Sequence, residues 1–380
     1  MLAHALASPA TPRRCPSGRA PLTLGLLLLL LLPAPGRPAG TPTPTPAATP
    51  APTPANPVNP PKPVRPSRPI SYKPGPGPHE VARAHYDWVD EARHRPVPVT
   101  IYSPKGGEGR FPVIVFSHGL GGSRDGYAYL GRHWASYGYV VVHVQHMGSD
   151  GEIWKGREKG QVGAAIRQAL ANPQTALDRP ADVRFVLDQL AILNRDDPAF
   201  RGRLDLDHAG IAGHSFGAWT TLAIAGQVAV APSGRERSFA DPRFQAAISM
   251  SAPVPARREQ DALVYRNIKI PCFHLTGTKD DSPVGETRAA QRRIPFDRID
   301  GADQYLVTFK GGDHMVFSGR PRGAQGGEKD AQFQALIKMG SIAFWDAYLK
   351  GEVEAKAWLS RGGFSGVLGN DGVFEKKLKG

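Results

Sequence analysis

The chain has 380 residues, of which 41% are hydrophobic and 21% are charged, so it can bury a sizeable core and wholesale disorder is excluded. Its formal net charge is +13, from 47 Lys and Arg against 34 Asp and Glu. The basic residues are scattered rather than gathered into a basic helix, which argues against nucleic acid as a partner. The 43 Gly and 37 Pro exclude a long coiled coil and indicate a proline-rich segment beside a loop-rich globular part.

The N-terminal residues have the pattern of a secretory signal peptide. Arg13, Arg14 and Arg19 precede an apolar run at 22–32, and small residues follow that run. As a helix the run would rise about 16 Å, too short to cross a hydrocarbon core of about 30 Å. We therefore expect residues 1–39 to be a signal peptide that directs the protein to secretion or the periplasm. An uncleaved membrane anchor is the alternative.

A linker rich in proline and threonine is expected at 40–78. Proline fixes φ and has no amide donor, so this segment cannot join a helix or a sheet. Residues 79–380 are expected to form the catalytic domain. The chain has two cysteines, Cys15 and Cys272, and removal of the signal peptide would leave one thiol and no intrachain disulfide. Cys272 lies in an apolar run and is expected to be buried and inert.

Residues 79–380 alternate between strand-like and helical patterns. Short apolar runs predict strands at 97–102, 113–117, 139–144, 210–213, 246–250, 272–276 and 305–309. Helical patterns occur at 127–137, 181–193, 216–226, 287–293 and 331–350. Continuously apolar strands that alternate with helices predict an α/β fold with a mostly parallel sheet buried on both faces. Residues 151–179 fit no strand and are expected to form part of a pocket wall or a lid.

The segment Gly213-His-Ser-Phe-Gly217 matches the pattern G-x-S-x-G. The pattern alone is a weak signal, but here it follows an apolar strand and opens an apolar helix. This context predicts a nucleophile elbow, with Ser215 at a strained turn between strand and helix. A plain glycine–serine turn is the alternative.

A serine nucleophile needs a base within hydrogen-bond reach. His314 is the expected base, because it lies in a glycine-rich loop after the last predicted strand. His118 and His214 also lie near the predicted site, but too early in the chain for the usual order of such residues. His143 and His146 could be read as a metal pair, but neither a carboxylate nor a cysteine completes a site. We expect these two to be structural or pocket-lining, and we expect no metal or cofactor.

The imidazole needs an acid to orient it, and Asp280 follows the predicted strand at 272–276 directly. Asp281 and Asp313 are its competitors. The expected catalytic residues therefore run in the order Ser215, Asp280, His314, which is the order of the α/β-hydrolases.

Acyl transfer also needs donors for the developing oxyanion. The glycine-rich segment Ser117-His-Gly-Leu-Gly-Gly122 follows a predicted strand, so its amides can face the serine. We expect the amides of Leu120 and Phe216 to be these donors, with Gly119 beside them in the substrate-binding loop. A phosphate-binding loop is the alternative, but the segment lacks the Lys-Ser/Thr ending that phosphate binding requires.

These pieces resemble the α/β-hydrolase superfamily, and within it the dienelactone-hydrolase-like and platelet-activating-factor-acetylhydrolase-like serine esterases. The segments Val115-Phe-Ser-His-Gly-Leu-Gly121 and Gly213-His-Ser-Phe-Gly217 are similar to the acetylhydrolase branch. The resemblance covers roughly residues 85–350. It implies an eight-stranded, mostly parallel sheet with helices on both faces, and metal-free ester hydrolysis through an acyl-enzyme.

The position of the acid departs from the acetylhydrolase branch. There the acid follows the first strand after the nucleophile, whereas here residues 251–255 hold no carboxylate and Glu259 is the first one. Asp280, one strand later, matches the general α/β-hydrolase and dienelactone-hydrolase pattern. Dienelactone hydrolases proper, however, use a cysteine nucleophile.

The sequence therefore predicts a secreted serine carboxylesterase. Its expected partner is a small-molecule or lipid ester substrate, and the sequence indicates no stable protein partner. A phospholipid esterase like the platelet-activating factor acetylhydrolases is the first alternative. A non-catalytic binding protein with the α/β-hydrolase fold is the second, although both Ser215 and His314 are present. A serine peptidase of similar fold would lack its usual β-propeller domain.

Overall fold

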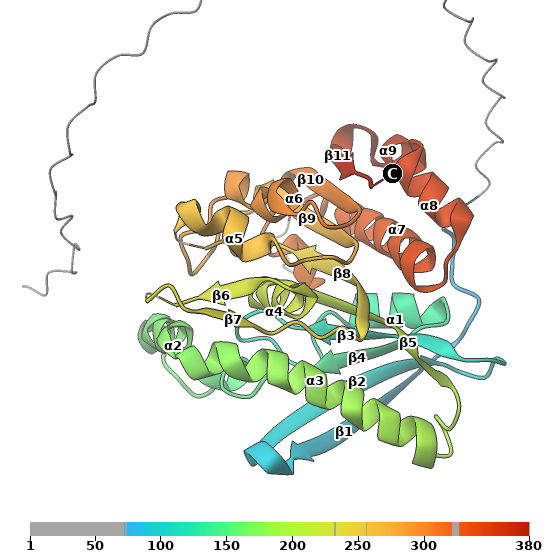
Figure 1. The fold of residues 1–380 in the computed structure, drawn as a ribbon, viewed down its shortest axis with the longest axis horizontal. Helices are drawn as coiled ribbons and strands as arrows, with labels where there is room; N and C mark the ends of the chain where they lie inside the picture. The colour runs from blue at the N-terminus through green and yellow to red at the C-terminus, as the bar shows by residue number, and fades with distance from the viewer. Residues whose placement is uncertain (1–71, 73, 232, 256, 321–326, 380) are drawn as a thin grey trace, which may run out of the picture. The chain divides into compact units, whose positions relative to one another are not determined.

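A nine-stranded sheet organises the chain in the order β1-β2-β4-β3-β5-β8-β9-β10-β11 (Figure 1). The computed structural model describes residues 72, 74–231, 233–255, 257–320 and 327–379. The predicted signal peptide and most of the predicted linker lie outside these residues. The strands of the sheet are β1 (Val81–Asp90), β2 (Arg95–Pro104), β3 (Phe111–Ser117), β4 (Val140–Val144), β5 (Leu204–His214), β8 (Phe244–Met250), β9 (Cys272–Lys279), β10 (Gln304–Asp313) and β11 (Gly372–Lys377).

The centre of the sheet is parallel, from β4 through β3, β5, β8 and β9 to β10. Strands β1, β2 and β11 pair antiparallel at the two edges. Every residue of β3 and β4 is buried, as expected for strands covered on both faces. The α/β class with a mostly parallel sheet is confirmed. The described sheet has nine strands rather than the expected eight, because β11 adds a half-exposed, charged edge that no apolar run marks in the sequence.

Helices cover both faces of the sheet (Figure 1). One face carries α1 (Ala128–Ser136), α7 (Asp330–Leu349), α8 (Val353–Ser360) and α9 (Gly363–Leu368), and here Trp134 and Trp345 meet edge to face at 5.7 Å. The other face carries α3 (Pro173–Asp196), α4 (Phe216–Ala225) and α5 (Asp261–Tyr265), whose apolar residues join a second core. A short hairpin of β6 (Val228–Val230) and β7 (Glu236–Ser238) stands apart from the main sheet.

Every predicted strand coincides with an observed one, apart from residues at the ends. The helix expected at 287–293 is wrong, since this stretch holds the 3-10 turn Ala289–Gln291, followed by α6 (Ile294–Arg298). Pro295 has no amide to continue a helix from the preceding turn, so the chain starts a new one there. Residues 151–179 hold the 3-10 turn Gly151–Ile153, helix α2 (Lys159–Ala171) and the start of α3. In the described part of the chain no helix is both long and apolar enough to cross a membrane.

Candidate active site

Ser215 lies at a strained turn between β5 and α4. Its φ of 57° and ψ of −119° are rare for a residue with a side chain. A Cβ on Gly213 would collide with the carbonyl of Gly217, and one on Gly217 would collide with the carbonyl of Ser117. The two flanking glycines therefore allow strand and helix to approach closely enough to present the Ser215 hydroxyl at the end of the sheet.

The structure brings the three expected catalytic side chains together. His314 Nε2 lies 2.9 Å from Ser215 Oγ, and His314 Nδ1 lies 2.7 Å from Asp280 Oδ1. His314 follows β10, and Asp280 follows the neighbouring strand β9 and is fully buried. The competing carboxylates have other partners, since Asp281 accepts the amide of Ala289 and Asp313 accepts the amide of Met315. Of the three candidates, Asp280 is the one whose carboxylate bonds the His314 ring in the described residues.

A layer of residues that sequence reasoning missed holds Asp280 in place. Ser251 and Thr276 donate hydroxyl hydrogen bonds of 2.6 and 2.8 Å to Asp280 Oδ2. The buried guanidinium of Arg292 donates to the carbonyls of Asp280 and Ser251, and burial lowers the pKa of Arg292. Ser251 directly follows β8 at a φ of 55°, at the start of the segment 251–255 that holds no carboxylate.

The expected oxyanion loop packs against the nucleophile. A Cβ on Gly119 would lie 3.3 Å from Ser215 Cβ. The amides of Gly121 and Gly122 are used within the protein, by the carbonyls of Ser149 and Gly119. Within the described ranges, no acceptor bonds the amides of Leu120 and Phe216. These two amides, the expected pair, are therefore available to a ligand, and their role stays a prediction.

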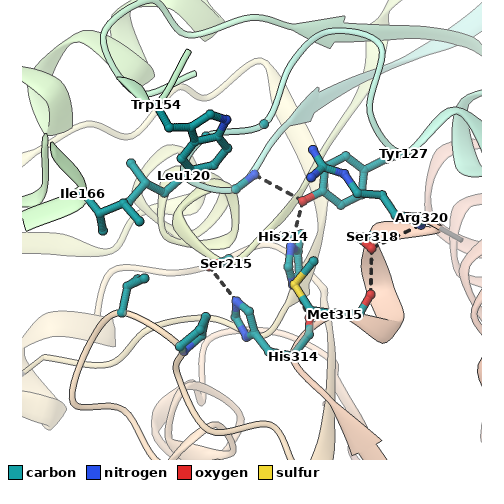
Figure 2. Close-up of a pocket in the computed structure, with 15 residues that line it drawn as sticks. Leu120, Tyr127, Trp154, Ile166, His214, Ser215, His314, Met315, Ser318 and Arg320 are labelled. Carbon is teal, nitrogen blue, oxygen red and sulfur yellow. Dashed lines mark hydrogen bonds between the residues drawn. The ribbon is translucent and has the colours of Figure 1, made fainter. Parts of the chain in front are cut away.

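A cavity of about 190 Å³ opens beside Ser215 (Figure 2). Trp154 and Ile166 form an apolar side of this cavity, and Tyr127 and Arg320 lie on the opposite side in the view of Figure 2. Trp154 and Ile166 come from residues 151–179, so this segment contributes to the pocket wall, one of the two roles expected of it. Of the expected oxyanion residues, Gly119 and Leu120 line the cavity, whereas the Phe216 side chain does not.

The other candidate bases have structural partners. His214 Nδ1 lies 2.8 Å from the Tyr127 hydroxyl, and its Nε2 lies 2.9 Å from the carbonyl of His314, so it buttresses the loop that carries the base. Burial and the nearby His314 lower the pKa of His214, which keeps it neutral. His118 Nδ1 donates to the carbonyl of Gly119. Burial likewise lowers the pKa of His118.

The two histidines considered as a metal pair lie in different surroundings. The ring of His143 packs against Phe116 at 4.8 Å, and burial lowers the pKa of His143 to about 4. The ring of His146 bonds Ser117 and Asp182 instead. Neither ring lines the cavity beside Ser215, and the contacts of both favour the structural one of the two expected roles.

Comparison with known proteins places this geometry in context. Residues 94–154 match the family model described as platelet-activating factor acetylhydrolase, isoform II. The platelet-activating factor acetylhydrolase of Cavia porcellus is 32% identical over 155 residues, covering 33% of this chain and 34% of the relative. The enzymes of Canis lupus familiaris and Bos taurus are 24% and 26% identical over 240 and 239 residues, each covering 55% of this chain and 48% of the relative.

The chain thus spans between a third and a half of the length of these curated relatives. The expected resemblance to a platelet-activating-factor-acetylhydrolase-like serine esterase of the α/β-hydrolase superfamily is confirmed.

Proposed function

We propose that this chain hydrolyses carboxylic esters through an acyl-enzyme on Ser215, with His314 as general base and Asp280 as the orienting acid. The observation that carries the proposal is the continuous hydrogen-bond chain from Ser215 Oγ through the His314 ring to Asp280, at 2.9 and 2.7 Å. Such a chain activates a hydroxyl that would otherwise be a poor nucleophile at neutral pH.

In the proposed mechanism, His314 Nε2 accepts the Ser215 proton while Oγ attacks the ester carbonyl carbon. The amides of Leu120 and Phe216 donate to the oxyanion that forms on the carbonyl oxygen. The intermediate collapses to the acyl-enzyme, and the alcohol leaves with the proton held by His314. A water molecule then attacks the acyl-enzyme, with His314 taking its proton and returning it to Ser215. The chemistry requires no cofactor.

For the substrate, we propose a phospholipid ester like those of the acetylhydrolase relatives, in place of the general carboxylesterase expected from the sequence. The cavity offers an apolar side at Trp154 and Ile166 and a cation, Arg320, on its other side. Within the described residues the Arg320 guanidinium has no acidic partner, so it is available to an anionic group of a substrate. The proposed site is acetylhydrolase-like except for its acid, since Asp280 follows β9, the strand position expected for a dienelactone-hydrolase-like enzyme.

Arg320→Gln is expected to lower kcat/KM for a 2-acetyl glycerophospholipid by about twofold to fivefold, the range for one ion pair at an exposed site. Turnover of p-nitrophenyl acetate, which has no anionic group, should not change. The measurement is steady-state kinetics on both esters, with Arg361→Gln, an exposed arginine at the end of α8, as the control. An equal loss on both esters, or no loss on the phospholipid, would contradict the assignment of Arg320.

We further propose that residues 1–39 are removed on export, that 40–78 form a linker and that 79–380 form the catalytic domain. The basic start, the short apolar run at 22–32 and the small residues after it support export. Intact-mass measurement of protein collected outside the producing cell should give a chain that begins near residue 40. A full-length mass recovered from a membrane fraction would support the anchor instead.

A further inference from the structure

Arg179 of helix α3 is fully buried behind the predicted oxyanion loop, and the proposed mechanism gives it no role. Each of its guanidinium nitrogens donates a hydrogen bond. Nε bonds Thr220 Oγ1 at 3.0 Å, and Nη1 bonds Ser149 Oγ at 2.8 Å. Nη2 bonds Ser117 Oγ at 3.1 Å and also the carbonyl of His118.

These contacts connect the two segments that carry the predicted oxyanion donors. His118 lies two residues before Leu120, whose amide is one donor. The guanidinium carbon of Arg179 lies 4.5 Å from the centre of the Phe216 ring, and Phe216 carries the other donor amide. Thr220, one turn along α4, also donates to the carbonyl of Phe216 at 3.1 Å. One side chain therefore joins the loop after β3 to the first turn of α4.

Ser117, which accepts from Arg179, belongs to a second chain of hydrogen bonds beneath the predicted oxyanion loop. Ser117 Oγ donates to His146 Nε2 at 2.9 Å, and His146 Nδ1 donates to Asp182 Oδ2 at 3.0 Å. Burial and the charge of Arg179 lower the pKa of His146, which keeps it neutral and able to accept from Ser117. This second Ser–His–Asp chain is buried, with Ser117, His146 and Asp182 each 0% exposed. No ester can reach it, so its role is to support the loop.

Burying an arginine costs free energy, and desolvation lowers the pKa of Arg179 to about 9. An apolar residue could fill the same space without that cost. A buried cation with four hydrogen bonds and a ring contact indicates that the directional bonds of Arg179 hold this part of the structure in place.

We infer that Arg179 is a positioning residue of the oxyanion hole, which fixes the spacing between the amides of Leu120 and Phe216. The inference rests on the proposed function. Oxyanion stabilisation depends on donors that are already in place when the charge develops, and loss of one donor lowers kcat by roughly 10²–10³-fold. Since Arg179 acts on both donors without touching the substrate, its loss should lower kcat by about 10- to 100-fold and leave KM within about threefold.

The test compares Arg179→Met with Arg184→Met, which removes a half-buried arginine from the same helix. Both variants are assayed with p-nitrophenyl butyrate, and thermal unfolding and near-ultraviolet circular dichroism establish that they fold. Affinity for phenylboronic acid, which forms a tetrahedral adduct on a catalytic serine, should fall in Arg179→Met in parallel with kcat, while KM holds. Added guanidinium ion should restore part of kcat in Arg179→Ala and none in Arg184→Ala.

If Arg179→Met does not fold, Thr220→Val decides, because it keeps Arg179 and removes the Thr220 hydroxyl, which accepts from Nε and donates to the carbonyl of Phe216. This loss should lower kcat by about threefold with an unchanged KM. The inference is overturned if folded Arg179→Met has the kcat and the boronate affinity of the wild type. If Arg179→Met does not fold, the same result from Thr220→Val overturns it. Either outcome leaves the proposed function standing. A folded wild-type chain that hydrolyses no ester overturns the proposed function, and the inference with it.

Discussion

Ser215→Ala is expected to abolish ester hydrolysis, with kcat falling by roughly 10⁶-fold, as for loss of the serine nucleophile in subtilisin. The alanine can occupy the same strained turn, and the hydroxyl it lacks has His314 as its one side-chain partner among the described residues. The melting temperature should therefore change little. The measurement is kcat on p-nitrophenyl butyrate beside thermal unfolding, with Ser365→Ala, an exposed serine of α9, as the control.

The kcat of His314→Ala should fall to nearly the same level as that of Ser215→Ala, because the nucleophile and the base act as a unit. Near-wild-type turnover in Ser215→Ala would place the chemistry elsewhere. A mild effect of His314→Ala beside a severe effect of His118→Ala or His214→Ala would assign the base to another ring.

Asp280→Asn is expected to lower kcat by roughly 10³–10⁴-fold with little change in KM, by analogy with other such triads. The carboxylate holds His314 with Nδ1 protonated, which leaves Nε2 free to accept the serine proton, and it stabilises the imidazolium that forms. An asparagine of the same shape can present its amide group to Nδ1 and favour the wrong tautomer. Steady-state kinetics on a soluble ester, with thermal unfolding as the check on folding, measures the loss.

Asp281→Asn and Asp313→Asn serve as matched controls, and each should lower kcat by less than about tenfold. The reason is that the carboxylates of Asp281 and Asp313 accept hydrogen bonds from the backbone amides of Ala289 and Met315. A severe loss from Glu259→Gln with none from Asp280→Asn would return the acid to the earlier strand.

The displaced acid has a geometric explanation. Strands β8 and β9 are parallel neighbours, so their carboxyl ends meet at the same edge of the sheet, and the amide of Ser251 bonds the carbonyl of Leu275 at 2.8 Å. A carboxylate from either strand can therefore approach the His314 ring. In this chain the proposed acid, Asp280, follows β9, and Ser251, at the end of β8, donates to it.

The sequence predicted the elements that an apolar pattern marks, and missed those that it does not. The continuous runs of β3 and β4 are buried on both faces and were found. Strand β1 alternates between half-buried and exposed residues, and β11 is short and charged, so neither stands out from a loop. Helix α2 lies in a stretch with few buried residues, and it was expected only as part of a wall or a lid.

The same distinction applies to the site. Ser215, Asp280 and His314 could be proposed from the sequence because the order and the local context of such residues are characteristic, and the structure places their side chains within hydrogen-bond distance. The supporting residues Arg292 and Ser251 belong to no motif, and their partners come from distant parts of the chain. Arg179 offered one signal, since it shares a helical face with the buried Val183, Val186 and Leu190. A charged residue on an apolar helical face indicates that a buried polar group pairs with it. The sequence alone does not identify that group.

The most direct test of the proposed serine chemistry is labelling with a fluorophosphonate, which reacts with an activated serine in place of an ester. The folded protein is expected to form one adduct, located on Ser215 by mass spectrometry of the peptides, and labelling should be lost in Ser215→Ala and strongly slowed in His314→Ala. A folded chain that stays unlabelled would support the binding-protein alternative. An adduct on a different serine would contradict the assignment of the nucleophile.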